Sequence, residues 1–285
     1  MKKIILTLGM FFAIASINAQ TKTQSNVNIM TFNIRYDNPE DVPNNWEQRK
    51  ENVLKMIRFN EVDILGTQEV LAHQLKDLTV NLTEYGAIGV GREDGKEKGE
   101  YSPILYNKNK FTLIKSGYFW LSETPEKPSK GWDAACERIA TWVQLKDKTT
   151  GKKIFVINTH FDHRGEVARR ESVTLIKTKI AQLSEGMPQI MMGDLNATPD
   201  SSVIQSLLTA DKSLSLLDSK KLASIVYGPN WSFHDFGKIP FNDRPLIDYI
   251  LVTKGITVHK YAVFAETLNN LVLSDHAPVF INVAF

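Results

Sequence analysis

The sequence predicts an α/β fold, a four-layer sandwich in which two mixed β-sheets pack face to face with helices outside. Three observations lead to this fold class. Apolar strand-like runs alternate with amphipathic helical patterns, and a block of β-type patterns lies near the middle of the 285 residues. No repeat of fixed period, low-complexity tract or long linker interrupts the chain. We therefore expect the helices and strands to form one domain.

Five expected strands end at, or contain, polar side chains of catalytic type. Each is apolar at nearly every position, as expected of a strand that is covered on both faces. The runs are 27–31 before Asn33, 62–66 before Gln68 and Glu69, 154–157 before His160, 189–192 before Asp194, and 247–252 around Asp248. Such a scaffold presents the residues at its strand ends to solvent, so these ends predict a functional site.

Three segments carry helical signals. Over 46–59 and over 166–183, apolar side chains recur three and four positions apart and therefore share one face. Pro, Asp and Ser at 199–201 are capping residues that open a short third helix. The signal changes to β between residues 101 and 145, with strand-like patterns at 104–106, 111–121 and 139–145.

The first 19 residues have the pattern of a signal peptide, which leaves 20–285 as the mature domain. Lys2 and Lys3 precede an apolar run at 4–17, and Ala19 offers a small residue for cleavage. The run is too short to cross a bilayer easily, and no cysteine follows it to carry a lipid. We therefore expect an exported protein, periplasmic or extracellular, without a membrane anchor after cleavage.

Composition limits the classes of function. Hydrophobic residues make up 42% and charged residues 23%, an ordinary globular mixture. Without Lys2 and Lys3 the 34 basic residues become 32, equal to the 32 acidic ones, so bulk charge gives no argument for a nucleic-acid partner. Cys136 is the only cysteine, which excludes an intramolecular disulfide and suits a small buried hydrophobe. Only His160 and His163 are closely spaced, which argues against a dedicated zinc site.

Six short segments hold most of the unusual polar side chains. They are Thr31–Arg35, Thr67–Val70, Asn158–His163, Gly193–Asn196, Ile247–Ile250 and Ser274–Pro278. In this order they resemble the endonuclease/exonuclease/phosphatase superfamily, and the resemblance runs from about Val27 to the C-terminus. Each motif is weak alone, but six in order are a strong signal. The resemblance implies the DNase I-like fold and a metal-dependent hydrolase of phosphoester bonds.

A divalent metal is expected from this resemblance. Glu69 is the best candidate ligand, and Asn33 and Asp275 complete or support the metal's shell. Mg²⁺ is a hard cation that prefers carboxylate and amide oxygens, so Mg²⁺ is the expected cofactor and Mn²⁺ its substitute. The metal neutralises phosphate charge during hydrolysis.

The resemblance also implies the catalytic roles. Asp194 orients or deprotonates the attacking water, and Asn196 donates a hydrogen bond to the phosphate oxygens in the transition state. His276 holds the scissile phosphate while Asp248 fixes its tautomer, and His160 donates a second hydrogen bond to the developing charge.

Four further residues have looser motifs. Tyr106 matches a tyrosine that touches the phosphate in relatives, and Arg138 matches a phosphate-binding arginine. Ordinary strand packing explains Tyr106 about as well. Asp162 and His163 have two interpretations, a metal-ligand pair or substrate contact, and a loop hydrogen bond to Arg169 or Arg164.

Flanking residues distinguish the branches of the superfamily. The run at 245–249 lacks the Trp-Cys-Asp-Arg sequence of inositol polyphosphate phosphatases, and 33–35 lacks the Asn-x-Asn-Gly sequence of abasic-site endonucleases. The deadenylase and nocturnin branch, which removes nucleotides from the 3′ end of RNA, is most similar over 67–70, 193–202 and 273–278. The stretch 117–133 resembles a secreted bacterial subgroup.

Three functions are consistent with these patterns. The leading one is a secreted nuclease, a 3′–5′ exonuclease-like phosphodiesterase. The second is a phosphatase or phosphodiesterase of sugar phosphates, inositol phosphates or phospholipid headgroups. The third is a non-catalytic binding module, which the presence of Glu69, Asp194 and His276 argues against. The expected partner is a nucleic-acid or small phosphoester substrate, and no stable protein partner is implied.

Overall fold

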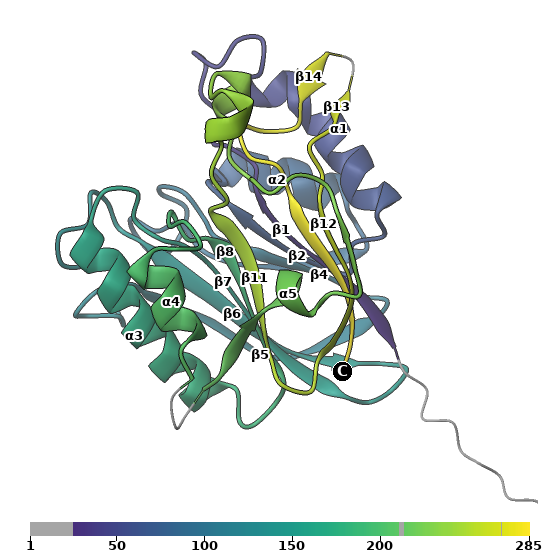
Figure 1. The fold of residues 1–285 in the computed structure, drawn as a ribbon, viewed down its shortest axis with the longest axis vertical. Coiled ribbons are helices and arrows are strands. Elements are labelled where there is room, and N and C mark those ends of the chain that lie inside the picture. Colours follow the sequence, from purple (N-terminus) through teal and green to yellow (C-terminus); the bar gives the residue numbers. More distant parts are fainter. Residues whose placement is uncertain (1–24, 211–213, 269) are drawn as a thin grey trace, which may run out of the picture.

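The computed structural model describes residues 25–210, 214–268 and 270–285, so the predicted signal peptide over 1–19 lies outside the described residues. Two large sheets pack face to face with helices on their outer sides (Figure 1), which confirms the predicted four-layer α/β sandwich. Within the described part of the chain, no helix has both the length and the apolar character that crossing a membrane requires.

Short strands and a few helices make up the described chain. The strands are β1 (Asn26–Asn33), β2 (Ile64–Gln68), β3 (Tyr85–Ile88), β4 (Ile104–Asn107), β5 (Phe111–Trp120), β6 (Ile139–Asp147), β7 (Lys153–His160), β8 (Gln189–Asp194), β9 (Leu216–Asp218), β10 (Ile225–Tyr227), β11 (Asp248–Thr253), β12 (Thr257–Val263), β13 (Thr267–Leu268), β14 (Leu271–Val272) and β15 (Val279–Ala284). The α-helices are α1 (Trp46–Phe59), α2 (Ala72–Asn81), α3 (Glu166–Leu183), α4 (Ser202–Leu208) and α5 (Ser219–Leu222).

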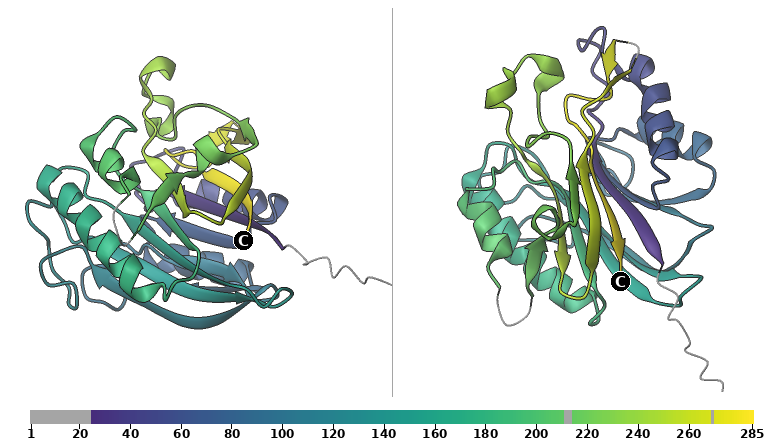
Figure 2. Two further views of the ribbon diagram at one scale, coloured as in Figure 1. Left: turned by 60° about the horizontal axis from the view of Figure 1, so that its bottom comes forward. Right: turned by 45° about the vertical axis from the view of Figure 1, so that its right-hand side comes forward.

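The strands form two large mixed sheets. One has seven strands in the order β10-β12-β15-β1-β2-β4-β3, and the other has six in the order β5-β6-β7-β8-β11-β9. The pair β1 and β2 runs parallel in the first sheet, and the pair β7 and β8 runs parallel in the second. Helices α1 and α2 cover the first sheet, whereas α3 and α4 cover the second (Figure 2).

Local signals explain the helix starts. The α1 and α3 helices match the predicted segments, and Asn45 caps α1 by accepting a hydrogen bond from the backbone N–H of Gln48 at 3.2 Å. Ser201 caps α4 by accepting from the Ile204 N–H at 3.3 Å. The sequence pattern did not predict α2, which is short and buries only Gln74 and Leu78.

Side chains along the central strands alternate between two environments. On β8, Ile190 and Met192 lie in the core between the sheets, whereas Met191 lies in the core beneath α3 and α4. On β1, Ile29 lies between the sheets and Met30 lies beneath α1 and α2. Both faces of these strands are therefore buried, which explains their nearly continuous apolar sequence.

Gly66 on β2 allows the two sheets to approach each other closely near the carboxyl end of this strand. A Cβ atom at Gly66 would lie 2.6 Å from Met192 Cε and 2.8 Å from the Asn158 side chain of the other sheet. Asn158 then links the sheets, because its Nδ2 donates to Thr67 O at 2.8 Å and its Oδ1 accepts from Gln68 Nε2 at 2.6 Å. A larger residue at position 66 would push these groups apart.

Candidate active site

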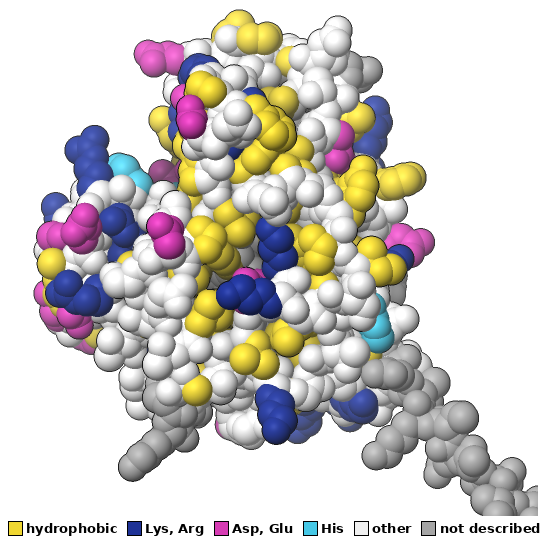
Figure 3. All heavy atoms as spheres, in the orientation of Figure 1, with side chains coloured by type: hydrophobic (Ala, Val, Ile, Leu, Met, Phe, Trp, Pro, Cys, Tyr) yellow, Lys and Arg dark blue, Asp and Glu magenta, His cyan; other side chains and the backbone are white. Residues whose placement is uncertain are grey.

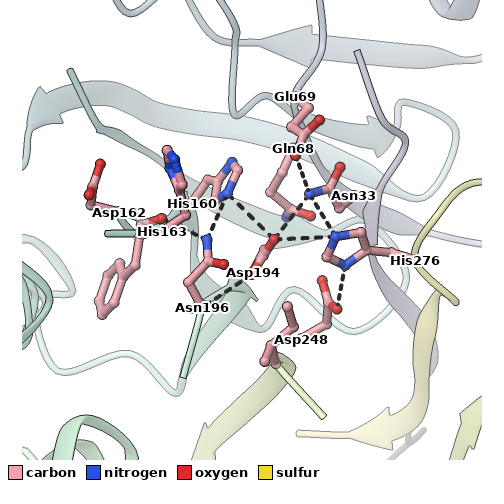
Figure 4. A network of polar contacts seen from close by, with 12 residues as sticks. Asn33, Gln68, Glu69, His160, Asp162, His163, Asp194, Asn196, Asp248 and His276 are labelled. Carbon is pink, nitrogen blue, oxygen red and sulfur yellow. Dashed lines mark hydrogen bonds and ion pairs between the residues drawn. The ribbon is translucent and has the colours of Figure 1, made fainter. Parts of the chain in front are cut away.

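Strand register brings the predicted catalytic residues to one edge of the sandwich (Figure 4). The parallel strands β1 and β2 pair Asn33 with Gln68 at their carboxyl ends. The parallel strands β7 and β8 pair His160 with Asp194, and the antiparallel strand β11 places Asp248 opposite Asp194. Since side chains alternate along each strand, Asn33, His160 and Asp194 occupy the same inward faces as the apolar residues further along.

Asn33 lies at the centre of the hydrogen-bond network (Figure 4). Its Nδ2 donates to Glu69 Oε1 and to Asp194 Oδ2, each at 3.0 Å, and lies 3.4 Å from His276 Nε2. His276 Nδ1 lies 2.8 Å from Asp248 Oδ2, and His276 Nε2 lies 3.7 Å from Asp194 Oδ2. The Asp248 carboxylate therefore fixes the ring with Nε2 directed toward Asp194 and Asn33.

Asn196 and His160 lie on the other side of Asp194 (Figure 4). Asn196 Nδ2 lies 3.0 Å from His160 Nε2 and donates to Phe161 O at 3.0 Å. The Asn196 backbone N–H donates to Asp194 Oδ1 at 3.0 Å, and His160 Nε2 lies 3.4 Å from Asp194 Oδ2. Asp194 is thus held from both sides, with polar groups converging on its carboxylate.

Burial and neighbouring charge shift the ionisation of the central pair. Burial and then the Asp248 carboxylate raise the pKa of Asp194 to about 7. Burial opposes a charge on His276, but the carboxylates of Asp248 and Asp194 outweigh this effect and raise its pKa to about 10. The two shifts have one cause, since three ionisable groups share a buried space and only the imidazolium balances the carboxylates.

Three residues at this edge have a strained backbone conformation. Arg35, Glu69 and Asn196 are non-glycine residues with φ angles of 59°, 61° and 46°. Such left-handed conformations cost about 1–3 kcal/mol each and are typical of functional sites. Gly193 has a φ of 148°, and a Cβ there would lie 1.9 Å from Thr159 O, so glycine is required beside Asp194.

The three expected metal ligands gather around Arg35. Its Nη1 lies 3.8 Å from Glu69 Oε2, its Nε lies 3.8 Å from Asp275 Oδ2, and its backbone N–H donates to Asn33 Oδ1 at 3.0 Å. Burial raises the pKa of Asp275, and the charge of Glu69 adds to this shift. Crowded carboxylate oxygens with an amide oxygen are the donor set of a hard divalent cation, so these residues fit Mg²⁺ or Mn²⁺.

Among the described residues, two side-chain groups bring three possible metal-ligating atoms within 4.8 Å of one another. They are Asp194 with Asp248 and His276, and Cys136 with Asp162 and His163. The first group belongs to the catalytic network. In the second group, Asp162 Oδ2 and His163 Nδ1 are already hydrogen-bonded to Arg138.

Arg138 and the Asp162 loop form a basic wall of the site. Arg138 Nε donates to Asp162 Oδ2 at 3.2 Å, and its Nη2 donates to His163 Nδ1 at 2.9 Å. Asp162 also accepts from the backbone N–H groups of Arg164 and Gly165 at 3.0 and 2.8 Å. The carboxylate of Asp162 thus pairs with the Arg138 guanidinium, whereas Arg169 Nη1 donates to the Asp162 backbone O at 2.8 Å and Arg164 contributes only its backbone N–H.

A cleft of about 400 Å³ joins the metal-ligand end to the basic wall. It is lined by Arg35, Tyr36, Glu69, Arg92, Glu100, Cys136, Arg138, His160, His163, Asp194, Asn196, Phe233, Ile247, Asp275 and His276. Burial, followed by the charges of Arg138 and Arg92, lowers the pKa of His160 well below its usual range. His160 is therefore a neutral imidazole at neutral pH, which can donate a hydrogen bond without carrying charge.

Tyr106 is not brought to this cleft. It lies on β4 in the apolar core between the sheets, is 9% exposed, and is absent from the residues that line the cleft. A Cβ at Gly86 would lie 2.6 Å from the Tyr106 hydroxyl, which shows how closely strand β3 covers this ring. Strand packing, the alternative reading of Tyr106, agrees with this position, so Tyr106 is withdrawn from the catalytic set.

Two arginines in and around the site, Arg49 and Arg92, were not recognised in the sequence. Arg49 on α1 is fully buried and donates to Ile34 O at 2.8 Å and to Leu273 O at 2.7 Å. It thereby joins the loops that follow Asn33 and precede Asp275. A charged residue on the apolar face of the helical pattern was the available signal for Arg49, whereas no local signal distinguishes Arg92, which lines the cleft, from a surface arginine.

The site and fold together define the class of protein. A four-layer sandwich carries acidic, amide and imidazole side chains around one carboxylate at a sheet edge, as the hydrolysis of phosphoesters requires. Residues 30–276 match the model of the endonuclease/exonuclease/phosphatase family, so the chain belongs to this family and is a phosphoester hydrolase by class. The resemblance of the six motifs is confirmed.

Solved structures refine this likeness. An endonuclease/exonuclease/phosphatase from Bacteroides vulgatus is 45% identical, with 91% of this chain and 98% of that chain covered and a TM-score of 0.88. A mannosyl-6-phosphatase from Bacteroides thetaiotaomicron is 36% identical, with 91% and 100% covered and a TM-score of 0.85. The catalytic domain of human nocturnin is 19% identical, with 92% and 97% covered and a TM-score of 0.70, which shows a shared fold.

Proposed function

We propose that this protein is a metal-dependent phosphomonoesterase that removes the phosphate group from a small sugar phosphate. The observation that carries the proposal is a polar cleft of about 400 Å³ with Asp194, Asn196 and His276 on its lining. This volume is in the range of sites for small molecules. The 36% identity with a mannosyl-6-phosphatase over 91% of the chain supports the same class of substrate.

A nuclease, the leading function from the sequence motifs, has less support. The likeness to nocturnin, at 19% identity, extends to the fold only. The formal charge of the whole chain is +2, and basic and acidic side chains are interspersed on the face seen in Figure 3. Neither feature supplies the single-sign basic surface that attracts a nucleic-acid backbone.

The side chains divide the work of hydrolysis. Asp194 accepts a proton from the attacking water, whose oxygen forms a bond to phosphorus as the bond to the sugar oxygen breaks. Asn196, His160 and His276 donate hydrogen bonds to the phosphoryl oxygens as charge builds on them. Asp248 keeps His276 oriented through the contact of 2.8 Å. The leaving sugar oxygen takes up a proton from solvent water and departs as a hydroxyl group, and Asp194 returns its proton to solvent.

Glu69, Asn33 and Asp275 hold the cation in this proposal. When bound, Mg²⁺ or Mn²⁺ supplies positive charge that neutralises the phosphoryl group and the leaving oxygen. Their own network prepares the site, because Asn33 bridges Glu69 and Asp194 and so couples the metal end to the general base.

The test compares two substrate classes with one protein preparation in Mg²⁺. Phosphate release is measured from mannose 6-phosphate and other hexose 6-phosphates, and shortening is measured with 5′-labelled single-stranded RNA and DNA. The Asp194→Ala protein runs beside it to detect a contaminating phosphatase or nuclease. We expect phosphate release that the variant lacks, and intact oligonucleotides.

A ladder shortening from the 3′ end, without release of phosphate from any hexose phosphate, would instead establish the exonuclease. Export is a separate part of the proposal, and it rests on the leader-like pattern at 1–19 and the resemblance to a secreted subgroup over 117–133. Cell fractionation checks it, and recovery of an unprocessed protein with the cytoplasm would refute it.

A further inference from the structure

Arg92 lines the same cleft as Asp194 and His276, although no sequence motif pointed to it. Its guanidinium forms a bidentate ion pair with Glu100, at 2.7 Å from Nη1 to Oε2 and 2.8 Å from Nη2 to Oε1. The two side chains are only 13% and 18% exposed. A bidentate pair of this kind fixes the plane of the guanidinium.

The loop around Arg92 is braced by its own backbone. The Arg92 N–H donates to Glu100 O at 3.1 Å, and Trp120 Nε1 donates to Arg92 O at 2.6 Å. Asp94 Oδ1 accepts from two backbone N–H groups of the same loop, at 2.7 and 3.0 Å. A Cβ at Gly91 would lie 2.2 Å from the opposing backbone, so the loop closes tightly just before Arg92. The position of Arg92 is therefore fixed by hydrogen bonds and close packing within this loop.

Arg138 is held in a similar way at the same wall. Its Nε and Nη2 are engaged by Asp162 and His163, at 3.2 and 2.9 Å, and its side chain is 4% exposed. Each arginine thus has a carboxylate partner, is fixed in orientation, and lines the cleft.

Three residues that line the cleft each have a buried nitrogen without a hydrogen-bond partner within the described chain. The nitrogens are Arg92 Nε, Arg138 Nη1 and His160 Nδ1. Buried donors are normally paired, so these nitrogens are candidates for hydrogen bonds to an acceptor bound in the cleft. Two of the three belong to permanently charged guanidinium groups, for which an anion is the fitting acceptor.

The two arginines act on the same part of the site. Their charges both depress the pKa of His160, the imidazole that contacts Asn196 and Asp194. The expected metal ligands Glu69 and Asp275 contact Arg35 instead. The cleft therefore has a metal-ligand end and a second cationic wall, with Asp194 lining the cleft that joins them.

We propose that Arg92 and Arg138 form a clamp for the non-bridging oxygens of a terminal phosphoryl group, and that this clamp selects phosphomonoesters over phosphodiesters. The inference rests on the proposed phosphomonoesterase function. A monoester dianion has three non-bridging oxygens and two negative charges, whereas a diester has two such oxygens and one charge. One non-bridging oxygen of the monoester faces the metal-ligand end of the cleft. Arg92 and Arg138 bind the non-bridging oxygens that remain. A diester replaces one of these acceptors with a bulky, uncharged ester group.

The experiment uses two synthetic substrates that share a leaving group, p-nitrophenyl phosphate and bis(p-nitrophenyl) phosphate. The ratio of kcat/KM for the monoester to that for the diester is measured for the wild-type protein, Arg92→Ala and Arg92→Lys. We expect Arg92→Ala to lower this ratio about 10- to 100-fold, the size of a lost charge-assisted hydrogen bond. Arg92→Lys keeps the charge but loses the bidentate pair, and it should fall between the two.

Glu100→Gln tests whether the ion pair with Glu100 holds the Arg92 guanidinium in the orientation that the clamp requires. It should lower the same ratio less than Arg92→Ala does, because Arg92 keeps its charge but loses its fixed plane. Arg58→Gln is the matched control, since this arginine is exposed in the last turn of α1 and lies outside the cleft. Its ratio should equal that of the wild type.

Inorganic phosphate supplies a readout that does not depend on turnover. Its inhibition constant should rise about 10-fold or more in Arg92→Ala, measured as binding to the variant if catalysis is too slow. Equal losses on both substrates, with unchanged phosphate binding, would overturn the clamp while leaving the proposed function intact. A wild-type preference for the diester would overturn both.

Discussion

The space between the two sheets has two ends of opposite character, although the same strands build both. On β8, Ile190 and Met192 contribute to the apolar core, and Asp194 follows on the same face two residues later. On β7, Val156 gives way in the same manner to Asn158 and then His160. The backbone register is continuous through both ends, so the change lies in the side chains alone.

The comparison shows how one scaffold separates stability from chemistry. Apolar side chains at one end gain free energy by leaving water. At the other end, buried polar groups must find partners, and some do not, as with Asp248 Oδ1 and Gln68 Oε1 in the described structure. The polar end is held in place by the apolar end through shared strands, and this is what allows strained residues such as Glu69 to persist.

Removal of the divalent metal should have the largest effect, and it acts only on the polar end. Dialysis against EDTA should reduce hydrolysis to background, and added Mg²⁺ or Mn²⁺ should restore it, because Glu69 and Asp275 otherwise repel the phosphoryl group. Circular dichroism should stay unchanged, since the apolar end holds the fold. Full activity in the presence of EDTA would show that hydrolysis does not require a divalent metal.

Asp194→Ala should lower kcat by about 10²- to 10⁴-fold, the contribution of a positioned general base. The variant should fold, because Ile190 and Met192 on the same strand keep their contacts. Steady-state kinetics with the preferred phosphoester measure the loss. Activity within about tenfold of the wild type would show that Asp194 is not the base.

Asp248→Asn should have a smaller effect, about 10- to 100-fold on kcat, because Asp248 acts through the orientation of His276. The substitution keeps the shape of the side chain. Asp218→Asn on the neighbouring strand β9 is the matched control, since Asp218 caps α5 through the Lys220 N–H at 2.9 Å and does not line the cleft. If the Asp248→Asn protein were as active as this control, Asp248 would not be needed to orient His276.

Ile190→Ala probes the apolar end and should change activity least. Loss of this fully buried side chain should cost about 2–5 kcal/mol of unfolding free energy, with kcat/KM in Mg²⁺ close to the wild-type value. Urea denaturation gives the stability, and Lys115→Ala, which removes an exposed ion pair with Glu185, is expected to cost at most about 1 kcal/mol. A strong loss of activity in folded Ile190→Ala would mean that the two ends are coupled.

The sequence predicted the elements that carry their own signals. The α1 and α3 helices follow from the spacing of apolar residues, and the start of α4 follows from Ser201. The strands that end in Asn33, His160 and Asp194 follow from apolar runs. Helix α2 was not predicted because it buries only Gln74 and Leu78, and two residues are too few to produce a recognisable helical pattern.

Tyr106 and Arg92 mark the limit of reading a sequence locally. Tyr106 has a loose motif and Arg92 has none, yet Tyr106 fills the core between the sheets and Arg92 lines the cleft. Their roles depend on which face of a strand, or which side of a loop, meets the other sheet. A single chain segment does not contain that information, because it arises from pairing across long sequence separations.

The sequence by itself determined the family, the four-layer fold and the chemistry of the motif residues, since local periodicity and side-chain type carry these properties. Tertiary structure alone decided that Arg92 and Arg138 share one wall while Arg35 contacts the metal ligands. Electrostatic energy depends on the distance between charges and on their burial. Both quantities exist only once strands far apart in the chain have packed against each other.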